Sequence, residues 1–159
     1  MTLASTFTVT QPSDTEVQLT REFDAPARLV WDAYTKPEYV RQWLLGPDGW
    51  DMPVCDIDLR VGGKFQYRWS HPTEGSFGTQ GEFTEVTPTS RIVNTERMEG
   101  FEGESIDTIT FEEANGRTTM TMTMRFPSKE ARDGAVATGM ADGVATSYDR
   151  LERIIDTFE

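Results

Sequence analysis

Few side chains in this sequence have the type and spacing that catalysis requires. His71 is the only histidine and lies in a predicted hairpin loop just before a proline, so we expect a solvated loop side chain rather than a catalytic base. Cys55 is the only cysteine, which excludes a disulfide within the chain and argues, with the single histidine, against a zinc site. No nucleophile elbow precedes a helix. We therefore expect no metal and no cofactor.

Four polar residues remain that can converge on an interior site. Arg21 has the same phase as the apolar residues of its strand, and a buried arginine needs a carboxylate partner. Asp107, in phase with apolar neighbours of its own strand, is one candidate; alternatively, Arg21 lies at the rim and reaches water. Tyr67 and Tyr148 are further candidates, and Tyr148 either offers its hydroxyl to a cavity or is an ordinary interface tyrosine.

Large apolar side chains are more prominent than polar ones. The segment 64–69 alternates aromatic and polar residues, and the segment 117–126 alternates methionine and threonine. Methionine is flexible and polarisable, so such a stripe suits an adaptable pocket, although it equally suits an ordinary core. We predict an internal cavity that binds a ligand and is walled by Trp43, Phe65, Tyr67, Trp69, Met122, Met124, Met140 and Val144.

Composition limits the classes of function. The 159 residues fit one domain, and the net charge of -12 without a visible basic patch argues against nucleic-acid binding. The opening sequence MTLASTFTVT lacks the basic and apolar regions of a signal peptide, and no membrane-spanning segment is visible. We expect a cytoplasmic monomer or homodimer that does not associate with membranes.

The predicted elements follow a simple order. Residues 1–15 are a tail or an extra strand, and a strand follows over 16–23. A helix then runs from Pro26 to Tyr34 with Asp24 as its N-cap, and a second helix runs from Pro37 to near Leu45. About six strands over 52–126 and one long helix over 128–158 complete the chain. A sheet with one apolar face must be covered, and the last helix is the available cover. Gly139 and Gly143 share one face of that helix, where Trp43 or a ligand is expected to pack.

Four stretches carry a family resemblance: REFDAP at 21–26, VWDAY at 30–34, WLLGP at 43–47 and DLRVGGKF at 58–65. With them, the chain resembles the START-like, birch-pollen-allergen-like (SRPBCC) superfamily, and within it the family named after the activator of the heat-shock chaperone ATPase. The resemblance implies an α+β helix-grip fold. In that fold a curved antiparallel sheet wraps a long C-terminal helix, with two short helices after the first strand. It also implies one START-like domain over 16–159 and a cavity between sheet and helix.

Three functions are compatible with this resemblance. The leading hypothesis is non-catalytic binding of a small hydrophobic or amphipathic molecule in the cavity. The second is an enzyme of the same fold, such as a polyketide cyclase or dehydratase, which requires two polar groups converging on the cavity. The third is a chaperone ATPase co-factor, against which we weigh the additional N-terminal domain that the eukaryotic activators carry and that is not seen here.

Overall fold

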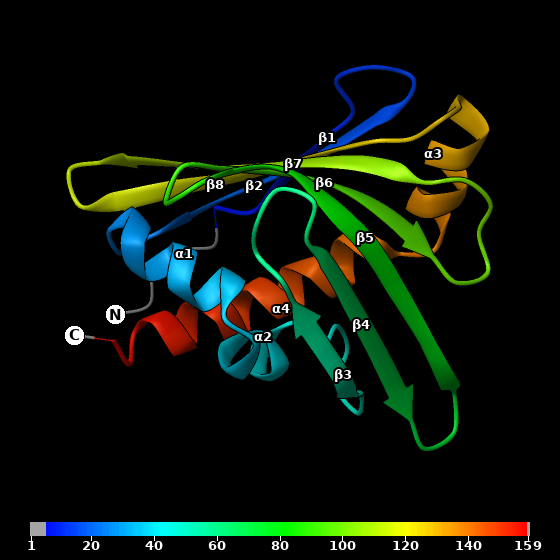
Figure 1. The fold of residues 1–159 in the computed structure, drawn as a ribbon, viewed down its shortest axis with the longest axis horizontal. Helices are drawn as coiled ribbons and strands as arrows, with labels where there is room; N and C mark the ends of the chain where they lie inside the picture. The colour runs from blue at the N-terminus through cyan, green and yellow to red at the C-terminus, as the bar shows by residue number, and fades with distance from the viewer. Residues whose placement is uncertain (1–5, 159) are drawn as a thin grey trace.

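The computed structural model describes residues 6–158, and within them eight strands form one antiparallel sheet in the order β1-β2-β8-β7-β6-β5-β4-β3 (Figure 1). The strands are β1 Thr8–Thr10, β2 Glu16–Phe23, β3 Asp51–Ile57, β4 Lys64–His71, β5 Gly75–Thr87, β6 Arg91–Met98, β7 Ser105–Ala114 and β8 Arg117–Arg125. The helices are α1 Ala27–Thr35, α2 Pro37–Trp43, α3 Lys129–Ala137 and α4 Met140–Ile155. No helix among these residues is long and apolar enough to span a bilayer.

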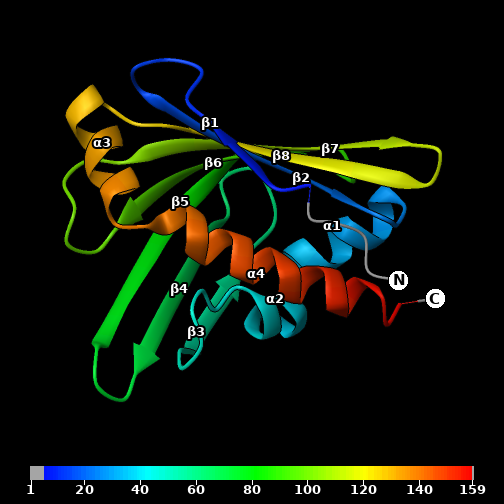
Figure 2. The ribbon, with the colours of Figure 1, turned by 180° about the vertical axis from the view of Figure 1, so that it is seen from behind.

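Helices α1, α2 and α4 lie on one side of the sheet, which curves over them (Figures 1 and 2). Alternation along each strand decides which side chains face these helices. In β2, for example, Val17, Leu19 and Phe23 are buried, and they pair across to β8, where Met124 and Met122 face Val17 and Leu19. The predicted α+β helix-grip fold, with two short helices after a strand and a helix gripped by the sheet, is confirmed.

The predicted hairpin at Asn115 and Gly116 forms because both residues take left-handed backbone angles, with φ of 56° and 75°. The prediction for the first helix was wrong at its start. Its N-cap is Pro26, without a side-chain cap, and the backbone N–H of Ala27 donates instead to Glu113 Oε1 at 2.7 Å. The carboxylate of Glu113, on β7, therefore caps the start of α1 in place of Asp24.

The single long helix predicted over 128–158 was also wrong, because the structure divides it into α3 and α4. Ser128 caps α3 as expected, since its Oγ accepts from the backbone N–H of Ala131 at 3.1 Å. The break falls at Gly139, whose φ of 79° is left-handed and cannot continue a right-handed helix. Val136, the valine of α3, is 39% exposed.

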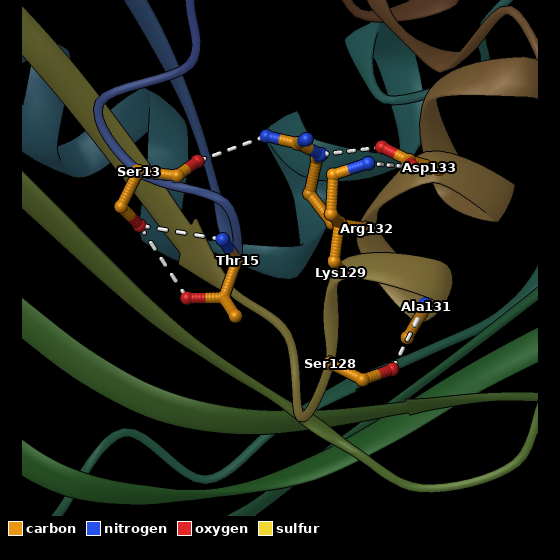
Figure 3. Close-up of polar contacts among 7 residues, drawn as sticks. All are labelled: Ser13, Thr15, Ser128, Lys129, Ala131, Arg132 and Asp133. Carbon is orange, nitrogen blue, oxygen red and sulfur yellow. Dashed lines mark hydrogen bonds and ion pairs between the residues drawn. The ribbon is translucent and has the colours of Figure 1, made fainter.

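Helix α3 turns away from the axis of α4 and is tied to the turn before β2 (Figures 2 and 3). Arg132 is buried; its Nη1 donates to the Ser13 carbonyl at 2.9 Å, and its Nε donates to Asp133 Oδ1 at 2.8 Å. Its guanidinium therefore fixes α3 at the end of the sheet, and the inner face is covered by α4 together with α1 and α2.

The sequence suggested that Trp43 or a ligand packs against Gly143, but the loop after α2 lies there instead. A β-carbon there would meet Pro47 Cδ at 3.8 Å and Gly46 Cα at 3.9 Å, so the glycine lets the loop after α2 approach α4. Arg150 of α4 then holds that loop by donating to the Gly46 carbonyl at 2.6 Å. Helix α2 ends at Trp43 rather than near Leu45.

The partner of Arg21 is neither Asp107 nor water. Its guanidinium is only 3% exposed and donates to Asp149 Oδ1 at 2.6 Å and to Glu152 Oε2 at 3.2 Å, both on α4. It also lies 5.5 Å from the centre of the Phe23 ring. A strand and the covering helix are thus joined by a buried cation whose counterions lie toward the surface.

Removing the two carboxylates should destabilise the protein more than removing the arginine. Asp149→Ala with Glu152→Ala leaves Arg21 buried without a counterion, and we expect the free energy of unfolding to fall by about 3 kcal/mol. Arg21→Met keeps the volume and frees two solvated carboxylates, so it should stay within about 1 kcal/mol of the parent. Urea unfolding followed by tryptophan fluorescence measures both; the reverse ranking would show that the ion pair itself supplies the stability.

The helix break can be tested with two glycines of the same region. Gly139→Ala should lower the free energy of unfolding by about 1 kcal/mol because alanine resists a left-handed φ. Gly134→Ala, inside α3 and with nothing within 4 Å of a new β-carbon, should raise it by up to about 1 kcal/mol. A stabilising effect at both positions would instead indicate one continuous helix.

Candidate functional site

Polar side chains gather on the inner face of two neighbouring strands, β6 and β7. Asn94 is opposite Asp107, and Glu96 is opposite Ser105, in the antiparallel register of these strands. Residues two apart on a strand share a face, so Glu96 and Asp107 are diagonal neighbours on the face that the helices cover. We call Glu96 and Asp107 the interior carboxyl pair.

The two carboxyl groups of the interior carboxyl pair lie close enough together that each affects the pKa of the other. Burial raises the pKa of both groups, and the charge of Glu96 raises that of Asp107 further. Ser105 Oγ donates to Asp107 Oδ1 at 2.9 Å. Among residues 6–158, no lysine, arginine or histidine forms an ion pair with either carboxyl group, and both groups therefore favour the protonated form more than an exposed carboxyl group does.

Thr79 on β5 adds a hydroxyl group to this region. The residue is 3% exposed, and its Oγ1 is buried without a partner at hydrogen-bond distance in the described part of the chain. The hydroxyl still lies close enough to Glu96 to favour the charged form of that carboxyl group. A buried hydroxyl without a partner is costly, so its position beside a carboxyl pair points to a group that the protein itself does not supply.

Three tyrosines from three different elements surround the pair: Tyr34 of α1, Tyr67 of β4 and Tyr148 of α4. Burial is the main cause that raises the pKa of all three phenols. The charge of Glu96 or Asp107 contributes in each case. Their hydroxyls therefore stay protonated and remain possible hydrogen-bond donors across the ordinary pH range.

The predicted wall residues fall into two groups. Fully buried are Trp43, Phe65 and Met124, while Tyr67, Trp69, Met122 and Val144 pack against the core and keep part of their surface accessible. The rings of Tyr67 and Trp69 meet edge to face, with centroids 5.9 Å apart. Met140 is the first residue of α4, next to the helix break. Whether these side chains enclose a cavity stays a prediction.

Of the four polar residues predicted to converge on an interior site, the structure brings Asp107, Tyr67 and Tyr148 to the same region. Asp107 belongs to the interior carboxyl pair, and its charge raises the pKa of the buried Tyr148. Arg21 instead binds the outer carboxylates of α4. The pattern of β6 and β7 contained a signal for Glu96, because polar residues occupy the inward phase of both strands at neighbouring positions; Thr79 gave no such signal.

A pocket of about 300 Å³ is bordered by β4, β5 and β6. Tyr67 is the one predicted wall residue that borders it. Its charged residues are already paired: Arg68 with Glu99 at 2.5 Å, and Arg97 with Glu104 at 3.9 Å. Thr79, which carries the unpartnered buried hydroxyl, also lines this pocket, so the pocket reaches one edge of the polar region around the interior carboxyl pair.

The remaining candidates for chemistry have structural roles. His71 is not solvated as expected: its side chain is 19% exposed, and its Nδ1 accepts the backbone N–H groups of Thr73 and Glu74 at 3.1 Å, closing the β4–β5 hairpin. Cys55 is buried, and burial raises the pKa of its thiol to about 11, so it is unreactive. Within residues 6–158 no group of three or more potential ligand side chains is arranged to hold a metal ion.

Asp107→Asn should make the protein more stable in mild alkali. A carboxyl group whose pKa is raised by folding holds its proton longer in the folded state, so stability falls as pH rises above the ordinary value of about 4. The amide removes this loss and can still accept from Ser105. We expect a gain of about 2–4 °C in Tm at pH 8 and none at pH 4, measured by thermal unfolding.

Glu112→Gln on the outward face of the same strand is the matched control and should leave the pH dependence unchanged. If Asp107→Asn lowered Tm at pH 8, the aspartate would be a stabilising anion rather than part of a strained pair.

The family described as "Activator of Hsp90 ATPase homolog 1-like protein" matches residues 24–156. No curated protein matches the chain. Among solved structures, a crystal structure from Rhodobacter sphaeroides is similar, with 26% identity, a TM-score of 0.90 and coverage of 96% of this chain and 99% of that one.

Two solution structures extend the comparison. A protein from Staphylococcus epidermidis is 27% identical with a TM-score of 0.79, and 96% of each chain is covered. An AHSA1-like protein from Aeromonas hydrophila is 18% identical with a TM-score of 0.70, covering 89% of this chain and 97% of that one. At that identity the second likeness concerns the fold alone.

Proposed function

The chain belongs to the family described as Activator of Hsp90 ATPase homolog 1-like protein, and on that premise we propose that it binds a small amphipathic molecule between its sheet and helix α4. One observation carries the proposal: a pair of carboxyl groups and an unpartnered hydroxyl stand inside an otherwise apolar, aromatic interior. The family and the helix-grip fold are of a kind suited to ligand binding. The identity of the ligand is the part that we infer.

The apolar part of the ligand would contact the partly accessible side chains. Tyr67 and Trp69 of β4, Met122 of β8 and Val144 of α4 come from three elements and leave surface that the core does not cover. Small-molecule sites in proteins are lined mainly by such groups, with a few polar atoms that fix orientation. Methionine adapts its shape to what it contacts, which suits a site formed by packing rather than by a rigid frame.

The polar part of the ligand would meet the interior carboxyl pair and Thr79. These groups lie on β5, β6 and β7, in the middle of the sheet, where the backbone is held by neighbours on both sides. A polar group at this point would satisfy the Thr79 hydroxyl and share hydrogen bonds with Glu96 and Asp107. An entirely apolar ligand would leave them unsatisfied, so an amphipathic one fits better.

An acid–base enzyme is the second candidate, and the observation that favours it is the raised pKa of both groups of the interior carboxyl pair. Two carboxyl groups with raised pKa values can hold one proton and one charge, and so act as general acid and general base. Native mass spectrometry would distinguish the two: a binder releases its bound molecule unchanged after incubation, and an enzyme converts it.

A role as a chaperone ATPase co-factor stays a prediction, which the name of the family suggests. A pull-down with the purified protein as bait tests it directly. Recovery of the chaperone by a variant with a filled interior would separate that role from ligand binding.

Filling the interior should weaken binding of a neutral apolar dye. We expect N-phenyl-1-naphthylamine to gain fluorescence with the parent protein, and Val144→Trp to weaken its binding at least about tenfold, or about 1.4 kcal/mol. Val136→Trp, on exposed α3, is the control and should bind as the parent does. Far-UV circular dichroism checks the fold of both. Equal binding by both variants would place the dye elsewhere.

A further inference from the structure

We propose that Glu96, Asp107 and Thr79 form the docking point for the protonated amino group of an apolar amine, whose hydrocarbon or aromatic part lies against Tyr67 and Trp69. This inference rests on the proposed function and names the chemical class of its ligand. It concerns the polar end of the site only and does not require a reaction.

The charge of the site selects a cation. The two carboxyl groups are neighbours on the inner face, Asp107 buried and Glu96 partly buried, and among residues 6–158 neither has a cationic partner. Arg21, on the same inner face, is already bound by Asp149 and Glu152 at 2.6 and 3.2 Å. Buried carboxylates without a counterion are unfavourable. A ligand that brings a positive charge would therefore form the ion pair that no side chain of the described residues forms.

The number of acceptors fits an ammonium group. A primary ammonium has three N–H donors and no acceptor. Glu96 and Asp107 each supply a carboxylate oxygen, and Thr79 supplies a buried oxygen that has no partner in the described chain. A ligand carboxylate or phosphate would instead place a third negative charge beside the pair.

The surroundings agree with this class. Tyrosine faces attract cations, and Tyr34 and Tyr67 lie near the pair on opposite elements of the interior. Tyr67 and Trp69 then continue as an aromatic surface along β4. The net charge of -12 attracts a cationic ligand and repels an anionic one at long range.

Binding should release a proton. In the free protein the pair holds a proton at a pH where ordinary carboxyl groups are ionised; a bound ammonium favours both carboxylates, and that proton passes to the buffer. The amine itself stays protonated throughout. Affinity should therefore rise with pH above the ordinary carboxyl value of about 4, up to tenfold per unit, until the pair has lost its proton in the free protein as well.

Other titratable groups facing the pair do not change charge in this range. The phenols of Tyr34 on α1, Tyr67 on β4 and Tyr148 on α4 have raised pKa values, as does the thiol of Cys55 on β3. Arg21 on β2 is always charged. The pH dependence thus reports on the interior carboxyl pair.

Calorimetric titration at pH 7.5 with matched probes tests the proposal: 2-phenylethylamine against 2-phenylethanol, and 1-hexylamine against 1-hexanol. At least one amine should bind tenfold or more tightly than its alcohol. Buffers of different ionisation enthalpy should show proton release. Glu96→Gln and Asp107→Asn should each reduce the ratio of amine affinity to alcohol affinity to about twofold, whereas the outward-facing Glu112→Gln should keep the ratio of the parent protein.

The outcomes separate the two levels of inference. If alcohols bind as tightly as amines, or if both variants keep the preference, amine docking is overturned and ligand binding stands. If the neutral dye binds and no amine does, amine docking is likewise overturned and ligand binding stands. If neither dye, amine nor alcohol binds, the proposed function and the amine docking fail together.

Discussion

Attachment of helix α4 to the sheet is the constraint on which the interior depends. The inner face of the sheet is apolar along β2, β7 and β8 and must be covered, and α4 is the helix that crosses it. A buried guanidinium on β2, that of Arg21, reaches two carboxylates of α4. Arg150 of α4 holds the loop after α2. Helix α4 therefore contacts the sheet, the two short helices and the loop after α2, and these elements enclose one interior.

The same attachment explains why the interior contains both a paired cation, Arg21, and two carboxyl groups without a cationic partner among the described residues. Arg21 has its counterions, but they lie at the surface, with Asp149 51% exposed. The interior carboxyl pair lies on the same face without a counterion among the described residues. An arginine reaching the pair would hold the pKa values of both carboxyl groups down; because Arg21 binds the helix instead, burial leaves those pKa values raised.

The polar cluster on β5, β6 and β7 is expensive for folding and has no evident structural purpose. Glu96, Asp107 and Thr79 face a core that apolar residues would fill more stably, since buried polar groups stabilise a fold only when their hydrogen bonds are satisfied. Proteins carry such local departures from good packing mainly where a site requires them. The ligand binding that we propose gives that departure a reason.

Local sequence determined much of the fold. Alternation in segments such as 64–69 and 117–126 defined strands, Asn115-Gly116 defined a hairpin, and Ser128 defined a helix start, because each depends on neighbours along the chain. Tertiary structure decided what depends on distant partners. The left-handed Gly139 broke a helix whose apolar pattern continued through it, Glu113 capped α1 from another strand, and register alone set Glu96 beside Asp107. Side-chain phase can be read from sequence, but which strands become neighbours is set only when the whole sheet closes over its helix.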